Sequence, residues 1–262
     1  MIKALGIGLA LFGLIASNIA RSDDYRQFET RPGVTVSAIV AAPDDPRAVA
    51  VLFSGGRGVV GARPDGTLRH GSNFLVASRD RFARNGIVAV VVDAPSDRIR
   101  EGLEDGFRES AAHGEDIRLV IQALRRDYKL PIWLVGTSRG STSVANAGVR
   151  LQDTPPDGLV LTSSISRENR RGGNVLDMKL SDIRIPTLVA HHLEDDCRVT
   201  PYDGAVEIED GLTGAGRVEL IAFDGGQQTG NPCKPFSHHG FMGQRDVVVH
   251  VIADWIHANS LI

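Results

Sequence analysis

Short apolar segments alternate along this chain with longer segments in which apolar residues recur every third or fourth position. Uninterrupted apolar runs are typical of strands buried on both faces of a sheet, and the longer period is typical of helices with one buried face. Strands are predicted at 34–40, where the pattern alternates, and at 48–53, 87–92, 132–135, 159–162, 187–192 and 218–223. Helices are predicted at 74–85, 116–128, 141–149, 204–212 and 246–258.

This order of elements predicts an α/β fold with a mostly parallel central sheet and helices on both faces. With 262 residues, of which 42% are hydrophobic, the chain is long enough for one such domain, which we place at 21–262. Too few residues lie between the strands at 159–162 and 187–192 to form a large cap domain. In sheets of this kind ligands bind at the carboxyl ends of the strands, and the polar residues discussed below all follow a strand.

The first twenty residues have the pattern of a signal peptide. Lys3 precedes an apolar run, Ala4 to Ile15, and small or polar residues follow up to Ala20. The run is shorter than the roughly 20 residues of a membrane-spanning helix, so we expect removal of 1–20, export to the periplasm or medium, and no stable membrane span afterwards. The alternative is a buried N-terminal core helix.

The charge of the chain excludes one class of partner. A net charge of −3 and a pI near 6.2, without a long basic block, do not favour nucleic-acid binding. The glycine-rich stretch Ser54-Gly55-Gly56-Arg57-Gly58 follows a buried strand, but no Lys-Ser or Lys-Thr pair follows it, so it is not a nucleotide-binding P-loop. We therefore expect no cofactor, and a backbone contact to a substrate oxygen is the better use of this loop.

A candidate nucleophile lies between the predicted strand at 132–135 and the helix that follows it. The sequence there is Gly136-Thr137-Ser138-Arg139-Gly140. Small residues on both sides allow a strained turn that holds a serine hydroxyl out of the sheet, next to a helix N-terminus that favours negative charge. Because the motif has the strand and helix it requires, we predict that Ser138 is catalytic.

Together with two later motifs, this serine makes the chain resemble an α/β-hydrolase. The second motif is His191-His192-Leu193-Glu194-Asp195-Asp196-Cys197, and the third is His238-His239-Gly240-Phe241 before the last helix. The order Ser, Asp, His is the one that this fold uses, and the resemblance extends from about the first strand to the end of the chain. It implies that Ser138 attacks an acyl carbonyl, His239 transfers its proton, and an aspartate orients the histidine.

The resemblance leaves the exact acid open. Asp196 matches best, because Val199 and Pro201 follow at the usual distance, and Asp195 is the alternative. His239 is preferred over His238 as the base, because His-Gly-Phe matches the histidine loop of the family.

The same resemblance implies an oxyanion hole. One donor is the backbone N–H of Arg139, and the second comes from the glycine-rich loop, with Gly56 as the first choice and Arg57 as the second. The family often has His-Gly in that loop where this chain has Ser54-Gly55, which leaves the second donor open.

Cys197 follows the predicted acid, and Cys233 lies shortly before the predicted base. If the acid touches His239, these two loops are neighbours, and in an exported protein we expect the two cysteines to form a disulfide. The alternative is two buried thiols.

Arginines around the predicted site suggest an anionic substrate. Arg57 and Arg139 flank the oxyanion site, and three further candidates for binding a carboxylate or phosphate follow the strand at 159–162: Arg167, Arg170 and Arg171. A solvated basic loop is the alternative.

A metal could also be held by the His and Asp residues at 191–196, Cys197 and the histidines at 238–239. The spacing of the common metal motifs is absent and the serine would have no role, so we predict no metal.

The prediction is an exported serine hydrolase of the α/β-hydrolase fold, of the dienelactone-hydrolase-like or small-esterase type. It would cleave a small carboxylic ester, with or without an anionic group, through an acyl-enzyme intermediate. A peptidase or amidase with the same triad and a non-catalytic binding member of the fold are the alternatives.

Overall fold

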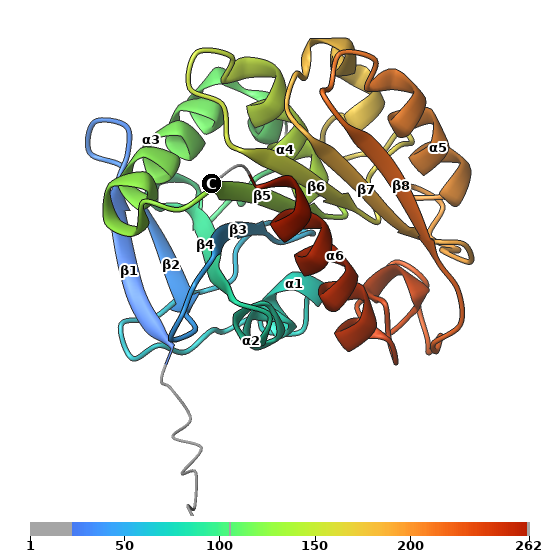
Figure 1. The fold of residues 1–262 in the computed structure, drawn as a ribbon, viewed down its shortest axis with the longest axis horizontal. Helices are drawn as coiled ribbons and strands as arrows, with labels where there is room; N and C mark the ends of the chain where they lie inside the picture. The colour runs from blue at the N-terminus through green and yellow to red at the C-terminus, as the bar shows by residue number, and fades with distance from the viewer. Residues whose placement is uncertain (1–22, 105, 261–262) are drawn as a thin grey trace, which may run out of the picture.

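The computed structural model describes residues 23–104 and 106–260, and the predicted signal peptide at 1–20 lies outside them. One eight-stranded sheet runs through this part of the chain, in the order β1-β2-β4-β3-β5-β6-β7-β8 (Figure 1). Strands β3 to β8 are parallel to one another, whereas β1 pairs with β2, and β2 with β4, in antiparallel fashion. The prediction of a mostly parallel sheet is confirmed.

The strands are short and mostly buried. Their bounds are β1 Asp24–Glu29, β2 Thr35–Ala41, β3 Ala48–Phe53, β4 Ile87–Pro95, β5 Ile132–Thr137, β6 Gly158–Thr162, β7 Thr187–His192 and β8 Val218–Phe223. Strand β1 was not predicted. Its sequence is polar, because it is an edge strand in which only Phe28 is buried.

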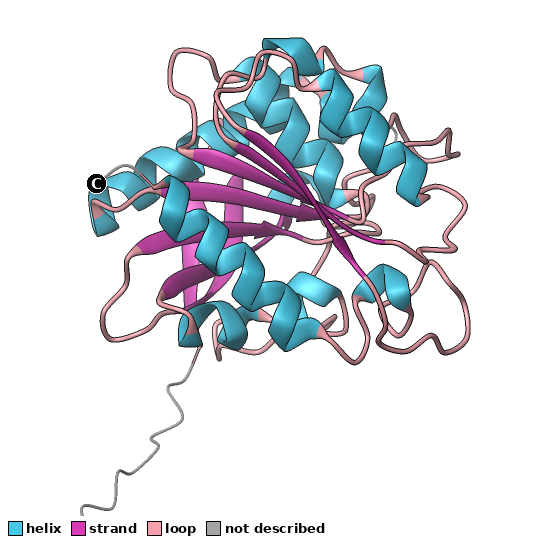
Figure 2. Ribbon diagram, turned by 45° about the vertical axis from the view of Figure 1, so that its right-hand side comes forward, coloured by secondary structure: helices cyan, strands magenta, loops and turns pink. Residues whose placement is uncertain are grey.

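Helices cover both faces of the sheet (Figures 1 and 2). The helices are α1 Phe74–Ala77, α2 Arg79–Arg84, α3 Ala111–Tyr128, α4 Gly140–Arg150, α5 Tyr202–Gly211 and α6 Arg245–Asn259. Helices α3, α4 and α5 bury their apolar residues on one face, and α1, α2 and α6 bury theirs on the other. The sheet therefore has a hydrophobic core on each face, and three helices cover each core.

Strand β3 shows why the central strands are apolar throughout. Val49, Val51 and Phe53 lie in the core under α3 to α5, and Ala50 and Leu52 lie in the core on the opposite face. Because successive side chains of a strand point to opposite faces, burial of both faces requires an uninterrupted apolar run.

Two helix predictions need correction. The predicted helix 74–85 is two short helices that meet at Ser78. Helix α3 begins five residues before the predicted start, because the side chain of Ser110 accepts a hydrogen bond from the amide of His113 (3.1 Å) and so caps the helix.

The segment between β6 and β7 contains two 3₁₀ turns, η3 Val175–Asp177 and η4 Leu180–Asp182, and no cap domain. Val175, Leu180 and Ile183 anchor it in the core under α4 and α5. No helix in the described part of the chain combines the length and apolarity needed to cross a membrane.

Candidate active site

Ser138 occupies a strained turn between β5 and α4. Its φ of 53° lies in the left-handed region that residues other than glycine rarely adopt. The flanking glycines are required by space: a Cβ on Gly136 would lie 2.4 Å from the Gly140 carbonyl oxygen, and one on Gly140 would lie 2.0 Å from the Phe53 carbonyl oxygen. The chain therefore forms here the strained strand-turn-helix that the sequence predicts, and the role of Ser138 as a nucleophile stays a prediction.

Neighbouring residues hold the backbone of Ser138 on both sides. Its amide donates to the Thr162 carbonyl oxygen (3.0 Å), and its carbonyl oxygen accepts from the amide (3.0 Å) and the hydroxyl (2.6 Å) of Ser141. The side chain lies at a cleft of about 440 Å³ at the carboxyl ends of the strands. His239, the glycine-rich loop at 54–57 and the segment 233–235 line the same cleft.

The acid next to His239 is Asp195, the alternative, and the prediction of Asp196 is wrong. Oδ2 of Asp195 lies 2.9 Å from Nδ1 of His239, and both side chains are buried. Asp196 is exposed and accepts a hydrogen bond from Gln228 (2.8 Å). The physical reason is the tight turn after β7, which directs the first carboxylate inward and the second outward.

Asp195 is held by more groups than the sequence revealed. Its Oδ1 accepts from the Cys197 amide (3.0 Å), its Oδ2 accepts from the Thr200 hydroxyl (3.0 Å), and Nε2 of His191 lies 3.5 Å away. Burial alone would raise the pKa of Asp195, but the hydrogen bonds and charges of His191 and His239 outweigh it and leave the pKa below its ordinary value. Asp195 is therefore ionised at neutral pH.

Thr200 contacts both members of this pair, because its hydroxyl also lies 3.1 Å from Nδ1 of His239. Its carbonyl oxygen lies 2.9 Å from Nε2 of His191. Sequence reasoning missed the role of Thr200 and considered His191 only as a metal ligand. A single Thr or His in an apolar context gives no signal of this role.

The backbone of His239 is fixed as well. Ser163, directly after β6, donates its hydroxyl hydrogen to the His239 carbonyl oxygen (3.0 Å) from a left-handed conformation with φ of 41°. Gly240 allows close packing, because a Cβ there would lie 2.2 Å from the Pro235 carbonyl oxygen. His239 lies in a short 3₁₀ turn, η5 His238–Gly240.

Cys197 and Cys233 form a disulfide, as predicted, with 4.7 Å between their Cα atoms. The bond joins the loop that carries Asp195 to the loop that carries His239. Cys197 is therefore not available as a metal ligand, although it lies close to both of these side chains.

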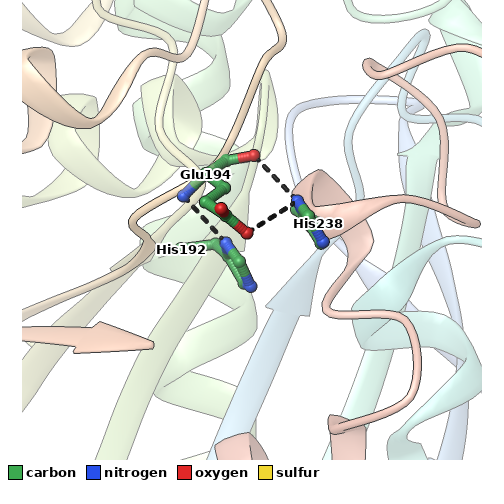
Figure 3. A group of neighbouring side chains, drawn as sticks. All are labelled: His192, Glu194 and His238. Carbon is green, nitrogen blue, oxygen red and sulfur yellow. Dashed lines mark hydrogen bonds and ion pairs between the residues drawn. The ribbon is translucent and has the colours of Figure 1, made fainter. Parts of the chain in front are cut away.

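His192, Glu194 and His238 form a second cluster at the same edge (Figure 3). The two imidazole rings stack, with centroids 4.2 Å apart. Nδ1 of His192 accepts from the Glu194 amide (3.0 Å), its Nε2 lies 2.7 Å from the Gly225 carbonyl oxygen, and Nδ1 of His238 lies 2.9 Å from the Glu194 carbonyl oxygen. Both Nδ1 atoms nearest to Glu194 are thus engaged by its backbone, so the cluster fits a structural contact better than a metal site. Burial lowers the pKa of His192, in keeping with a neutral ring.

The glycine-rich loop lies directly against Ser138. A Cβ on Gly55 would lie 2.9 Å from Cβ of Ser138, so only glycine fits there. Gly56 has a φ of 59°, and the amide of Gly58 donates to the Gly55 carbonyl oxygen (3.2 Å) to close a turn. Gly56 and Arg57 line the cleft, whereas the assignment of their amides and that of Arg139 to an oxyanion hole stays a prediction.

The three arginines after β6 do not line this cleft. Arg167 pairs with Asp203 (2.9 Å) and Glu207 (2.8 Å). Arg171 pairs with Glu104 (2.9 Å), which also pairs with Arg139 (3.3 Å), and Arg170 is exposed. Among the residues that line the cleft are two with cationic side chains, Arg57, which was predicted, and Lys234, which was not. The guanidinium of Arg57 donates to the Arg100 carbonyl oxygen.

A buried arginine lies behind the glycine-rich loop. Arg108 is 2% exposed, and burial together with the charge of Arg139 lowers its pKa to about 9, so it is still protonated at neutral pH. His113 is also buried, with Nε2 at 2.9 Å from the Ser143 hydroxyl, and burial together with the charge of Arg108 lowers its pKa to about 3.

The chain matches no known family model, and no curated protein is similar to it in sequence. Several solved structures share its fold. Dienelactone hydrolase from Anabaena variabilis superposes with a TM-score of 0.62 at 12% identity, over 91% of this chain and 99% of that one. A protein from Xanthomonas campestris, described as an α/β serine hydrolase without a lid, gives 0.59 at 15% identity, over 94% and 98%. A thermostable carboxyl esterase from Bacillus coagulans gives 0.61 at 13% identity, over 91% and 99%.

The element order, the sheet topology and these superpositions define the class: the chain has the α/β-hydrolase fold without a large cap. At these identities the likeness establishes the fold alone.

Proposed function

We propose that this protein is a serine hydrolase that cleaves a carboxylic ester through an acyl-enzyme intermediate. The observation that carries the proposal is the placement of an elbow serine, Ser138, in one cleft with His239, whose imidazole is held by Asp195. The fold agrees, since the solved structures similar to this chain include proteins described as esterases and a dienelactone hydrolase.

The chemistry follows from the order of these three groups. Nδ1 of His239 donates to Asp195, which leaves Nε2 to accept the proton of the Ser138 hydroxyl as its oxygen attacks the ester carbonyl carbon. The tetrahedral intermediate collapses, the protonated His239 donates its proton to the departing alcohol, and an acyl-serine forms. Water then attacks this ester with His239 again as the base, which releases the acid and restores Ser138.

Asp195 orients the histidine and stabilises its charged form. The lowered pKa of this carboxyl keeps it ionised while His239 gains and loses a proton. Its contacts with Thr200 and Cys197 fix the carboxylate in one orientation, and therefore fix the imidazole.

The cleft supports a small ester as the substrate. It has a volume of about 440 Å³, is lined by both polar and apolar side chains, and has no cap domain above it. The two cations that line it, Arg57 and Lys234, are without an ion-pair partner between residues 23 and 260, apart from the undescribed residue 105. We infer that esters with an additional anionic group are preferred, through these two side chains rather than Arg167, Arg170 and Arg171.

We also propose that the protein acts outside the cytoplasm. The disulfide between Cys197 and Cys233 fits an oxidising compartment, which agrees with the signal peptide expected at 1–20.

The test is a comparison of matched substrates with the mature chain and its Ser138→Ala variant. The wild type should hydrolyse p-nitrophenyl esters of short acids, and the variant should lose at least about 10³-fold in kcat/KM. Faster cleavage of the matched p-nitroanilides would instead identify an amidase or peptidase. Equal rates for the wild type and the variant would refute the proposal and leave a binding protein of this fold.

A further inference from the structure

Arg108 carries a buried positive charge, on which Glu109 and Glu104 act only through longer-range electrostatics. It lies in the 3₁₀ turn η2 Phe107–Glu109, ahead of α3, and no carboxylate oxygen in the described part of the chain lies within 4 Å of its guanidinium. Nη1 donates to the Ser143 hydroxyl (2.7 Å), and Nη2 donates to the carbonyl oxygens of Ser54 (3.1 Å) and Gly56 (3.3 Å). A buried charge without a counter-ion is costly, so its position calls for a reason.

The hydrogen bonds from Arg108 to these two carbonyl oxygens fix the direction of two backbone N–H groups. In a trans peptide the N–H points opposite to the C=O of the same peptide plane. The carbonyl of Ser54 shares its plane with the amide of Gly55, and the carbonyl of Gly56 shares its plane with the amide of Arg57. Because Nη2 holds both carbonyls, the N–H groups of Gly55 and Arg57 are directed away from Arg108.

The side opposite Arg108 is the candidate active site. Arg108 lines a small cavity of about 20 Å³ together with Ser54 and Gly58, whereas Ser138 lines the open cleft together with Ser54 and residues 55–57. The glycine-rich loop is therefore the wall between the two. It packs tightly on both sides, since a Cβ on Gly58 would lie 2.7 Å from Nη2 of Arg108 and one on Gly55 would lie 2.9 Å from Cβ of Ser138.

The amides on the cleft side are available to a ligand. The N–H groups of Gly55, Gly56 and Arg57 donate to no acceptor within residues 23–104 and 106–260. A carbonyl that accepts from a cation is polarised, and its peptide N–H becomes a stronger donor.

We propose that Arg108 is a positioning residue for the oxyanion hole: its guanidinium holds the Ser54 and Gly56 carbonyls so that the amides of Gly55 and Arg57 face the ester oxygen above Ser138. This inference rests on the proposed function. Of the two loop amides named from the sequence, it favours Arg57 over Gly56, and it adds Gly55. The positive charge of Arg108 also favours, through the loop, the negative charge that develops on the substrate oxygen.

Two substitutions separate the charge from the hydrogen bonds. Arg108→Lys keeps the charge but loses the paired donors, and Arg108→Gln keeps an NH₂ group but loses the charge. The control is Arg125→Gln, because Arg125 also donates to a carbonyl oxygen, that of Pro155 (2.7 Å), but does so next to Asp157 (3.1 Å) and before β6 begins, away from the cleft. Each variant is assayed for kcat, KM and the inhibition constant of a trifluoromethyl ketone. The serine oxygen attacks the carbonyl carbon of this ketone, the histidine takes the serine proton, and the adduct is a hemiketal oxyanion.

We expect both Arg108 variants to lose about 10- to 100-fold in kcat with KM changed less than about twofold, somewhat below the loss caused by removal of a direct oxyanion donor. The inhibition constant of the ketone should rise by the same factor, with Arg108→Lys less affected than Arg108→Gln, and Arg125→Gln should retain wild-type kcat. Folded Arg108 variants with wild-type kcat, or a loss of kcat without a matching loss of ketone affinity, would overturn the inference.

If neither variant folds, the wild type decides. On reaction with the ketone, the ¹H–¹⁵N resonances of Gly55 and Arg57 should move to lower field, and unchanged resonances with Ser138 occupied would overturn the inference. A wild type that neither hydrolyses esters nor reacts with the ketone would instead refute the proposed function.

Discussion

Oδ2 of Asp195 lies 2.9 Å from Nδ1 of His239, although the two residues are 44 positions apart in the chain. The neighbouring carboxylate, Asp196, points to solvent and contacts Gln228. The backbone after β7 thus selects one of two adjacent aspartates as the partner of the imidazole.

Two asparagine substitutions test this selection. Asp195→Asn removes the charge that orients and stabilises the protonated His239, so kcat should fall by about 10³- to 10⁴-fold. Asp196→Asn is the matched control and should change kcat less than about twofold. The assay is steady-state ester hydrolysis, and a larger loss in Asp196→Asn than in Asp195→Asn would contradict the assignment.

The disulfide should stabilise the fold and hold the two loops together. It links positions 36 residues apart, and closure of a loop of this length corresponds to about 4 kcal/mol in the chain-entropy model. The Cys197→Ser/Cys233→Ser double variant should lose free energy of unfolding of that order in urea titrations and should also lose kcat. Because reduction of the wild type tests the same bond without a substitution, equal stability and activity in both forms would refute this role.

His113 should make the protein sensitive to acid. Its folded-state pKa of about 3 lies below the value of about 6.5 expected when unfolded, so the unfolded chain binds more protons between these values. The stabilising contribution is complete above pH 6.5 and is lost as the pH falls toward 3, with about 2 kcal/mol lost at pH 5.

Urea denaturation at pH 7 and pH 5 measures this effect. His113→Gln should lower stability at pH 7 but lose about 2 kcal/mol less than the wild type between the two pH values. His250→Gln is the control, because His250 is exposed, and it should behave as the wild type does. Identical pH dependence in wild type and His113→Gln would show that burial of this imidazole is not the cause.

The preference for an anionic ester has its own test. Mono-p-nitrophenyl adipate and p-nitrophenyl hexanoate share a leaving group and an acyl length but differ in a carboxylate. At low salt the adipate should have the higher kcat/KM, and Arg57→Gln and Lys234→Gln should each lower it about fivefold without affecting the hexanoate, as expected for one exposed charge-assisted contact. Arg170→Gln should affect neither substrate, and equal kcat/KM values for the two esters in the wild type would rule out the preference.

The parts of this site that are local in sequence could be predicted. The elbow around Ser138 depends on glycines within two residues and on the strand and helix beside it, so the sequence was sufficient to identify it. The disulfide was also predicted, because the resemblance brought the acid and base loops together.

The parts of the site and fold that depend on contacts between distant residues could not be predicted from the sequence. The choice of Asp195 over Asp196 follows from the path of one turn, and a shift of one residue cannot be read from residue types. Arginine is usually found at the surface, and only the folded structure shows that the guanidinium of Arg108 is buried against two carbonyl oxygens. Strand β1 was missed because a polar edge strand lacks the apolar pattern on which strand prediction depends.

Reaction with a fluorophosphonate ester, followed by intact-protein and peptide mass spectrometry, shows directly whether Ser138 is a nucleophile. We expect one phosphonyl adduct per chain, located on the peptide that contains Ser138 and absent in Ser138→Ala. The adduct should be retained in Ser181→Ala, because Ser181 is an exposed serine in the turn η4. A wild-type chain that remains unmodified, or an adduct that persists in Ser138→Ala, would contradict the claim that Ser138, His239 and Asp195 act together as a nucleophilic site.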